Sequence, residues 1–277
     1  MSSYPRHLTR DLLGKRLREF RQAAGMSLAE AAEQTDISEA KLSKLERAVN
    51  NAVKLPDIFA CANVYGMSPE ETAHMIELAK GADSPSWFHP YDVPREFANF
   101  LELEGAASTL HIYQQEYIDG LFQTERYVAA LREARPDTKG GPDDGLRIER
   151  QEAVLNRPEP PSIVYVTDEA ALRRDVGGPA AMRDQVDHLV AMDDRDHISI
   201  YVIPFAAGAH PSMDGAYRLM YFDGTFPTTV YLESLHGSHY ENAEKDVRQY
   251  AAAFHRTRQP VLAVPIKEFM DENYKLA

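Results

Sequence analysis

The stretch SLAEAAEQTDISEAKLSKLE, from Ser27 to Glu46, predicts two short helices joined by a tight turn. Ser27 and Glu30 have the spacing of a capping box, in which each side chain accepts a hydrogen bond from the backbone N–H of the other residue. Ile37 supplies the apolar residue that a buried turn needs, and Ser38 is placed to cap the second helix. Together these signals predict a helix-turn-helix, a motif that enters the major groove of DNA.

The second of these helices has two different faces. Leu42 and Leu45 fall on the inner face, where they can pack against the other helices. The short and basic side chains that remain point outward and suit base edges and phosphates. The predicted DNA-binding residues are Ser27, Ser38, Glu39, Ala40, Lys41, Ser43 and Lys44. Ser27 is expected to hold a phosphate with its hydroxyl and backbone N–H, because it begins a helix.

Three further helices are expected around this motif. An amphipathic first helix ends at Gly25, and a fourth helix runs from Leu55 to Tyr65. A fifth opens at Ser68, which begins a capping sequence with Pro and Glu, and closes at Gly81. Five short helices in succession predict a compact all-α domain with one small core.

A chain of 277 residues is too long for that module alone, so we expect two domains. The helix-turn-helix domain is assigned to residues 1–80 and a linker to 81–92. The remaining residues, 93–277, are assigned to a larger α+β domain with a sensor, partner-binding or dimerisation role.

The net charge of −13 is unusual for a DNA-binding protein, but it is unevenly distributed. Residues 1–55 hold ten Lys and Arg against seven Asp and Glu, a local charge of +3. Residues 81–277 hold nineteen against thirty-two, a local charge of −13. Because DNA affinity depends on the local surface that faces the phosphates, the distribution is compatible with a basic DNA-binding domain on an acidic chain.

Residues 11–78 resemble the XRE/Cro-repressor-like helix-turn-helix family. The matching residues are Gly25, Ser27, Glu30, Ala32, Ser38, Ser43 and Glu46. In that family the Glu that ends the third helix pairs with an Arg of the first, so the resemblance implies a structural pair between Glu46 and Arg18 or Arg21. The family turn usually holds a Gly where this chain has Thr35-Asp36, and Asp tolerates left-handed backbone geometry.

The second domain is predicted to combine helices with a mixed or antiparallel sheet. Strands are expected at Leu110–Tyr113, Ser162–Thr167 and His197–Ile203, and a hairpin at Ala216–Phe222 and Thr228–Glu233. Helices are expected at Pro94–Glu104, from Thr124 to Ala134, from Asp143 or Asp144 to Asn156, at Pro179–Met192, at Tyr240–Arg256 and from Pro265.

The second domain contains the segment YQQEYIDGLFQTERYVAAL, which begins at Tyr113, and shorter motifs such as Arg147-x-x-Arg150-Gln151 and Tyr231-Leu232-Glu233. Through these motifs, most of residues 88–265 resembles a group of actinobacterial regulators, the WhiJ-like regulators. The second domain of that group has no settled biochemical role. The resemblance implies a small protein partner encoded nearby, in a pair similar to an antitoxin-type regulator and its partner.

A ligand or partner pocket is one hypothesis for the polar residues of this domain. Its candidate residues are Tyr113, Tyr117, Gln123, Arg150, Glu169 and Glu233. Structural roles are the alternative. Arg150 can form a buried salt bridge with Glu116, Glu169 or Glu233, or can help to hold an anion. Asp168 and Glu169 can orient a ligand, or can cap the helix that begins there.

No pattern of catalytic or metal-binding residues is visible. The chain lacks a nucleophile elbow, a phosphate-binding loop and the common zinc signatures. His236 and His239, with His210 and Glu233, match no zinc spacing, so we expect no metal and no cofactor. Cys61, the single cysteine, is expected to be a core residue.

The sequence predicts a cytoplasmic protein that has no membrane-spanning helix. No apolar run approaches the roughly 20 residues that a membrane helix needs. The first residues, MSSYPRHLTR, contain no apolar region typical of a secretory signal.

These observations favour a sequence-specific transcriptional regulator that binds a double-stranded DNA operator as a homodimer. Two hypotheses remain for the second domain: a sensor of a small molecule or peptide, and a docking surface for a small protein partner. In the second case the protein is an antitoxin-type binding module whose DNA binding is autoregulatory. An enzyme fused to a DNA-binding domain is a third hypothesis, which no catalytic motif supports, so we expect no enzymatic activity.

Overall fold

The computed structural model describes residues 6–49, 53–82, 87–88, 90–91, 93–134, 144–223, 226–234 and 237–273. Its internal contacts divide the chain into two compact units. The first comprises Met1–His89 with Leu101–Ala106, and the second comprises Pro90–Phe100 with Ala107–Ala277. The division passes through helix α6 (Arg95–Ala106), so each unit is described by itself.

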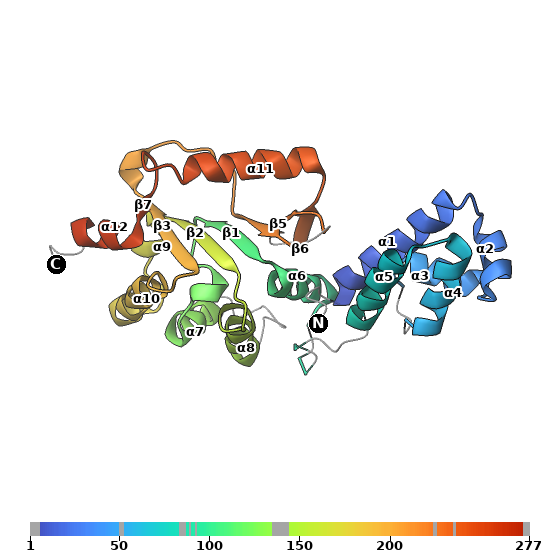
Figure 1. Ribbon diagram of the computed structural model, residues 1–277. Coiled ribbons are helices and arrows are strands. Elements are labelled where there is room, and N and C mark those ends of the chain that lie inside the picture. Colours follow the sequence, from blue (N-terminus) through green and yellow to red (C-terminus); the bar gives the residue numbers. More distant parts are fainter. Residues whose placement is uncertain are drawn as a thin grey trace. The chain divides into compact units, whose positions relative to one another are not determined.

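The first unit contains the five predicted helices (Figure 1). They are α1 (Arg6–Ala23), α2 (Leu28–Thr35), α3 (Glu39–Glu46), α4 (Leu55–Tyr65) and α5 (Pro69–Ala82). α5 therefore continues one residue beyond Gly81, the predicted end. The all-α helix-turn-helix fold expected for this part of the chain is confirmed.

The core of the first unit is made of apolar side chains from four helices. Leu13, Leu17, Leu42, Ile58 and Met75 are each at most 1% exposed. Burial of one such side chain stabilises the fold by about 1.5–3 kcal/mol, so these five fix α1, α3, α4 and α5 against one another. Leu42 is the member of this core that holds α3 in place.

A glycine sets the distance between α1 and α3. A Cβ atom added to Gly14 would lie 2.6 Å from the carbonyl oxygen of Leu45 and 2.8 Å from that of Glu46. Real Cβ atoms do not approach backbone oxygens so closely, because the atoms would overlap. The backbone of α3 therefore packs directly on α1 at Gly14, where no side chain intervenes.

The turn between α2 and α3 has the geometry that its sequence allows. Asp36 ends α2 in the left-handed region, at φ 57° and ψ 29°. Asp adopts this region more readily than most residues, because its short side chain can bond locally. Ile37, which follows, is 6% exposed and fills the turn as predicted.

The second unit is built on a seven-stranded mixed sheet in the order β6-β5-β4-β1-β2-β3-β7. The strands are β1 (Thr109–Gln114), β2 (Ser162–Asp168), β3 (Ile198–Ile203), β4 (Tyr217–Tyr221), β5 (Thr229–Ser234), β6 (Gly237–Glu241) and β7 (Val264–Pro265). β1, β2 and β3 are parallel, whereas β4, β5, β6 and β7 pair antiparallel with their neighbours. The predicted α+β class with a mixed sheet is confirmed, as is the β4–β5 hairpin.

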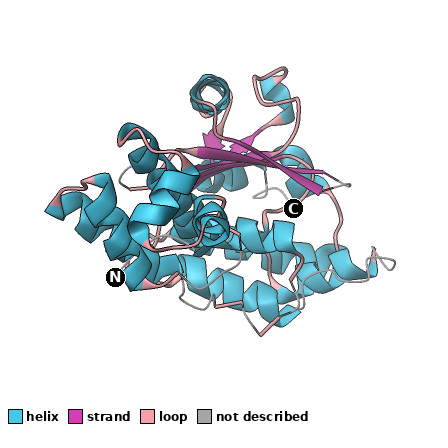
Figure 2. Cartoon of the chain, turned by 90° about the vertical axis from the view of Figure 1, so that its right-hand side faces the viewer, coloured by secondary structure: helices cyan, strands magenta, loops and turns pink. Residues whose placement is uncertain are grey.

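Helices cover both faces of this sheet. α7 (Glu125–Glu133), α8 (Asp144–Leu155) and α10 (Gly178–Met192) lie on one face and α11 (Glu244–Thr257) on the other (Figure 1). Figure 2 shows the strands nearly edge-on with helices above and below them. The connections from β1 to β2 and from β2 to β3 run through α7, α8, α9 (Glu169–Arg173) and α10, as parallel strands require. The chain ends with α12 (Ile266–Asn273).

One strand contradicts the sequence prediction. A helix was expected from Tyr240 to Arg256, but Tyr240 lies in β6 and α11 begins only at Glu244. The segment GSHYE has no alternation of apolar and polar residues, so its sequence does not identify it as a strand. Pairing with β5, from Ser234↔Gly237 to Val230↔Glu241, holds it extended.

Within the described ranges, no helix is long and apolar enough to cross a membrane.

Candidate nucleic-acid interface

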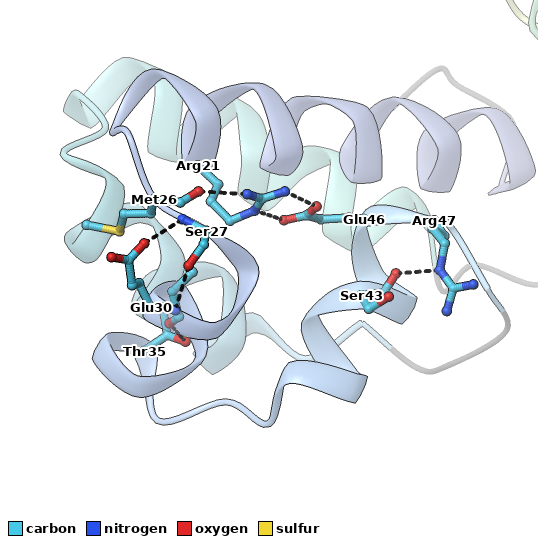
Figure 3. A network of polar contacts seen from close by, with 9 residues as sticks. Arg21, Met26, Ser27, Glu30, Thr35, Ser43, Glu46 and Arg47 are labelled. Atoms are coloured by element: carbon cyan, nitrogen blue, oxygen red, sulfur yellow. Dashed lines mark hydrogen bonds and ion pairs between the residues drawn. The ribbon is translucent and has the colours of Figure 1, made fainter.

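A bidentate ion pair fixes the end of α3 to α1. Nε and one terminal nitrogen of Arg21 donate to the two carboxylate oxygens of Glu46 at 2.6 and 2.9 Å (Figure 3). The other terminal nitrogen donates to the carbonyl of Met26 at 2.7 Å. Hydrogen bonding to Glu46 raises the pKa of Arg21. The resemblance left two partners open for Glu46, and the structure places Arg21 there, whereas Arg18 is exposed.

The exposed face of α3 carries most of the predicted reading residues. Glu39, Ala40 and Lys44 are exposed, and Ser43 is half-buried. Leu42 and Leu45, at 0% and 5% exposure, hold the opposite face in the core. α3 therefore presents short and charged side chains on a helix whose orientation is fixed by packing and by the Arg21–Glu46 pair.

Lys41 forms an ion pair with a residue of α4. Its Nζ lies 2.8 Å from Oδ1 of Asp57 and 2.7 Å from Oδ2. Asp57 is in the first turn of α4, and its side chain is only 12% exposed. The sequence placed Lys41 on the outward face as a base-reading residue, but in this conformation its ammonium group ties α3 to α4. The sequence shows that the first turn of α4 contains Asp57, but it does not indicate that Asp57 pairs with Lys41.

Ser27 has less capacity for a phosphate than we expected. Its backbone N–H donates to Oε2 of Glu30 at 2.8 Å, and its hydroxyl accepts from the Glu30 N–H at 3.2 Å. The capping box is therefore complete, and the side-chain hydrogen bond with Ser27 lowers the pKa of Glu30. A phosphate at this position would have to displace the Glu30 carboxylate from the Ser27 N–H. Of the two phosphate donors predicted at Ser27, only the hydroxyl hydrogen can donate to a phosphate without displacing Glu30.

Ser38 differs from Ser27 in this respect. It is the N-cap residue of α3, but its side chain makes no capping hydrogen bond. Its side chain is exposed, so the hydroxyl faces solvent at the start of the helix that carries the predicted reading residues. Ser38 is thus the better placed of the two serines for a contact with the DNA backbone.

The six candidate pocket residues of the second unit do not form one site. Tyr113 packs on the α11 face of the sheet, where its ring lies 5.7 Å from those of His210 and Tyr217. Tyr117 and Glu233 interact electrostatically with Arg150, which is carried by α8, on the other face of the sheet. The structure therefore places Tyr113 on one face of the sheet and Arg150 on the other, and it does not bring these six residues together.

A buried charge cluster surrounds Arg150. Asp119, Arg150 and Arg218 are all less than 9% exposed, and Arg218 donates to Asp119. The two guanidinium groups lie 4.9 and 5.1 Å from the centroid of the Phe100 ring. Burial lowers the pKa of Arg218 to about 10, which still leaves it charged at neutral pH. Of the three partners that the sequence named for Arg150, which were Glu116, Glu169 and Glu233, Glu233 does interact with it electrostatically. The stronger electrostatic interaction is with Asp119, which the sequence did not identify.

Glu169 and Gln123 bind the main chain and neighbouring side chains. Glu169 accepts from the Phe205 N–H at 2.8 Å and from Nε of Arg173 at 3.1 Å. Gln123 donates to the carbonyl of Ile118 at 2.6 Å and accepts from Arg147 at 2.7 Å. Glu169 and Gln123 therefore both form hydrogen bonds with other groups of the second unit.

The capping alternative for the segment after β2 is confirmed. Asp168 is the N-cap of α9 and accepts a hydrogen bond from the Ala170 N–H at 2.8 Å. Thr124 likewise accepts from the Tyr127 N–H at 3.4 Å and begins α7, as predicted.

Among the residues that the structure describes, no group of three or more His, Cys, Asp or Glu side chains could hold a metal ion. His210 lies 3.8 Å from Asp168, and His239 lies 2.6 Å from Glu241, in two separate pairs. His236 lies outside the described residues. Cys61 is fully buried, and burial raises its pKa to about 11, which disfavours the reactive thiolate.

Comparison with known families finds one match in each part of the chain. Residues 12–75 match a helix-turn-helix domain family, so the first unit is a domain of the DNA-binding helix-turn-helix class. Residues 97–263 match the family described as domain of unknown function (DUF5753), and the chain belongs to this family. Neither the curated proteins nor the solved structures that were searched contain a match to the chain.

Proposed function

We propose that the chain is a sequence-specific transcriptional regulator of the WhiJ-like group that binds a two-fold operator as a homodimer. The observation that carries the proposal is the exposed face of α3, with Glu39, Ala40 and Lys44, on a helix fixed by Leu42 and by Arg21–Glu46. A helix held in this way can place short side chains against base edges with little loss of conformational entropy. One such module buries little DNA surface, which favours a dimer with half-sites about one helical turn apart.

In this proposal the two lysines of α3 have different roles. Lys44 is exposed near the end of the helix and contacts a phosphate or a base edge. Lys41, which is held by Asp57, sets the angle between α3 and α4. The remaining reading residues are Glu39, Ala40 and Ser43, and Ser38 contacts the backbone at the start of the helix.

Both Lys44→Ala and Lys41→Ala are expected to weaken operator binding in gel-shift titrations, but with different salt dependence. Loss of a phosphate contact at Lys44 should reduce the slope of log affinity against log salt by about 1. Lys41→Ala should reduce the affinity through helix position and leave the slope unchanged. The operator is first selected from a random double-stranded library with the purified protein.

The exposed residue Lys245, on α11, provides the matched control, since Lys245→Ala removes the same charge from the second unit. Its affinity and slope should equal those of the unchanged protein. Unchanged affinity in both α3 variants would refute the assignment of α3 as the recognition helix.

We further propose that the second unit controls DNA binding by docking a small protein partner, in the manner of an antitoxin-type regulator. The specific support is the segment between β3 and β4, which exposes Phe205 and Met213 at 61% and 58%. Both side chains are large and apolar, so a protein partner that covered them would remove apolar surface from water. The alternative is a small-molecule or peptide sensor, and the absence of catalytic motifs in the sequence favours either role over that of an enzyme.

Native mass spectrometry of the protein purified from its host tests this choice. We expect a small protein bound to the unchanged chain, and Phe205→Ser with Met213→Ser should remove it. Ile148→Ser is the control, because Ile148 is another exposed apolar residue (48%) but lies on α8. A bound small molecule in place of a protein would favour the sensor, and a partner retained by the double variant would exclude this segment as the docking site.

A further inference from the structure

The outer edge of β6 is available for pairing with another strand. β6 has five residues and ends the sheet, and β5 occupies only its inner edge. Its outer edge makes no backbone hydrogen bond to any described residue. A row of free N–H and C=O groups of this length is a template for a further strand.

The opposite edge of the sheet is closed to such pairing. β7 has only two residues, and one of them is Pro265, which has no N–H to donate. α12 begins at the next residue, Ile266, and Ile266 is fully buried. Short edge strands, proline and a covering helix are the means by which proteins block edge-to-edge association. The sheet is therefore blocked at one edge and open at the other.

β6 is also held in a conformation suited to pairing. The hydroxyl of Tyr240 donates to the carbonyl of Glu96 at 2.9 Å, and its ring lies 5.3 Å from that of Tyr231 on β5. These contacts hold the strand in place, and no described residue forms a backbone hydrogen bond with its outer edge. A strand that is already ordered loses little conformational entropy when it binds.

The polar side chains of β6 are complementary to those of a second β6. His239 and Glu241 are two residues apart, so they face the same side of the sheet, and they lie 2.6 Å from each other. If two copies pair antiparallel about a two-fold axis at Tyr240, His239 of each copy lies opposite Glu241 of the other. Opposite charges or donor–acceptor pairs in directly opposed positions stabilise antiparallel strands, and the symmetry provides this pair twice.

We propose that β6 is the dimerisation edge of this protein and that its occupant is β6 of a second copy, paired antiparallel with the axis at Tyr240. The two sheets then form one continuous sheet. The biological role of this dimer rests on the proposed function, since a two-fold operator needs a two-fold protein. The interface itself does not depend on DNA, and it can be measured without DNA.

A charge exchange between two variants tests the pairing. In the acidic variant, His239→Glu places two carboxylates on each β6; in the basic variant, His239→Lys and Glu241→Lys place two ammonium groups there. Like charges then face each other in either homodimer, and self-association should weaken about tenfold in sedimentation velocity without DNA. An equimolar mixture of the two variants should restore the dimer, because unlike charges again face each other.

His255→Glu is the matched control, since it makes the same substitution at an exposed position on α11. It should associate like the unchanged protein. Recovery of the dimer in the mixture distinguishes an effect on the interface from an effect on folding, because a misfolded variant would not regain its fold when a second misfolded variant is added. Far-UV circular dichroism of each variant checks the fold.

Three results would overturn the proposal: an unchanged protein that stays monomeric at every concentration, charge variants that associate as well as the unchanged protein, or a mixture that does not recover. A dimer that passes this test but binds no DNA in gel shifts would refute the proposed function and leave the β6 interface standing.

Discussion

Asp119→Ala is expected to lower the free energy of unfolding of the second unit by about 3–5 kcal/mol. Asp119 is 8% exposed and accepts from Arg218, which is 5% exposed and lies beside Arg150 around the Phe100 ring. Removal of the carboxylate leaves buried guanidinium charge without its nearest counter-charge, and water cannot replace that carboxylate without opening the core. Urea denaturation followed by far-UV circular dichroism measures the change.

An exposed ion pair in the same unit supplies the control for Asp119→Ala. Asp184 pairs with Arg126 at 2.7 Å, and the two side chains are 51% and 67% exposed. Asp184→Ala should change the free energy of unfolding by less than about 1 kcal/mol, because solvent screens exposed pairs. The double variant Asp119→Leu with Arg218→Met should recover part of the stability, since apolar residues can replace a buried ion pair. Equal effects of Asp119→Ala and Asp184→Ala would show that burial does not govern this pair.

Gly14→Ala is expected to lower the free energy of unfolding of the first unit by about 1–3 kcal/mol and to weaken operator binding. The added methyl group would lie 2.6 Å from the Leu45 carbonyl oxygen, so α1 and α3 must separate. Separation moves α3, which carries the proposed reading residues, and strains the Arg21–Glu46 pair. Thermal unfolding and gel-shift titration measure the two effects.

Gly105→Ala is the matched control, because Gly105 is also helical and a Cβ there meets nothing closer than Nε1 of Trp87 at 3.9 Å. Gly105 is the second-last residue of α6, where the propensity difference between Ala and Gly is smaller than the about 1 kcal/mol of a helix interior. The control should therefore be neutral or stabilising. If Gly14→Ala is as stable as Gly105→Ala and binds DNA equally well, the close approach of α1 and α3 has no energetic consequence.

Local signals explain why the first unit was predictable. The Ser27–Glu30 capping box, the left-handed Asp36 and the helix end at Gly66 involve residues close in sequence, and their geometry follows from the backbone and the cap alone. The pairing of Glu46 with a first-helix Arg came from a family pattern, and the structure decided in favour of Arg21. The partner of Lys41 was missed, because Asp57 lies 16 residues away on another helix.

In the second unit, local signals predicted the individual strands and helices but not the cluster that they enclose. β2 and β3 are runs of β-branched and aromatic residues, so they were found. β6 is not such a run, and only its ladder with β5 makes it a strand. Asp119 and Arg218 are 99 residues apart, and nothing in either local sequence indicates the other.

The sequence by itself determined the helix-turn-helix fold of the first unit and the α+β class of the second, because helix caps, glycines and apolar periodicity act over a few residues. Only the tertiary structure decided which charged side chains form pairs and which lysine of α3 remains exposed. It also placed Tyr113 and Arg150 on opposite faces of the sheet and left the outer edge of β6 without a strand among the described residues. These depend on how distant segments pack, and burial then sets the strength of each contact through the loss of solvent. The sequence of one local segment thus determines the proposed DNA-reading helix, whereas the packing of the whole first unit determines where this helix lies.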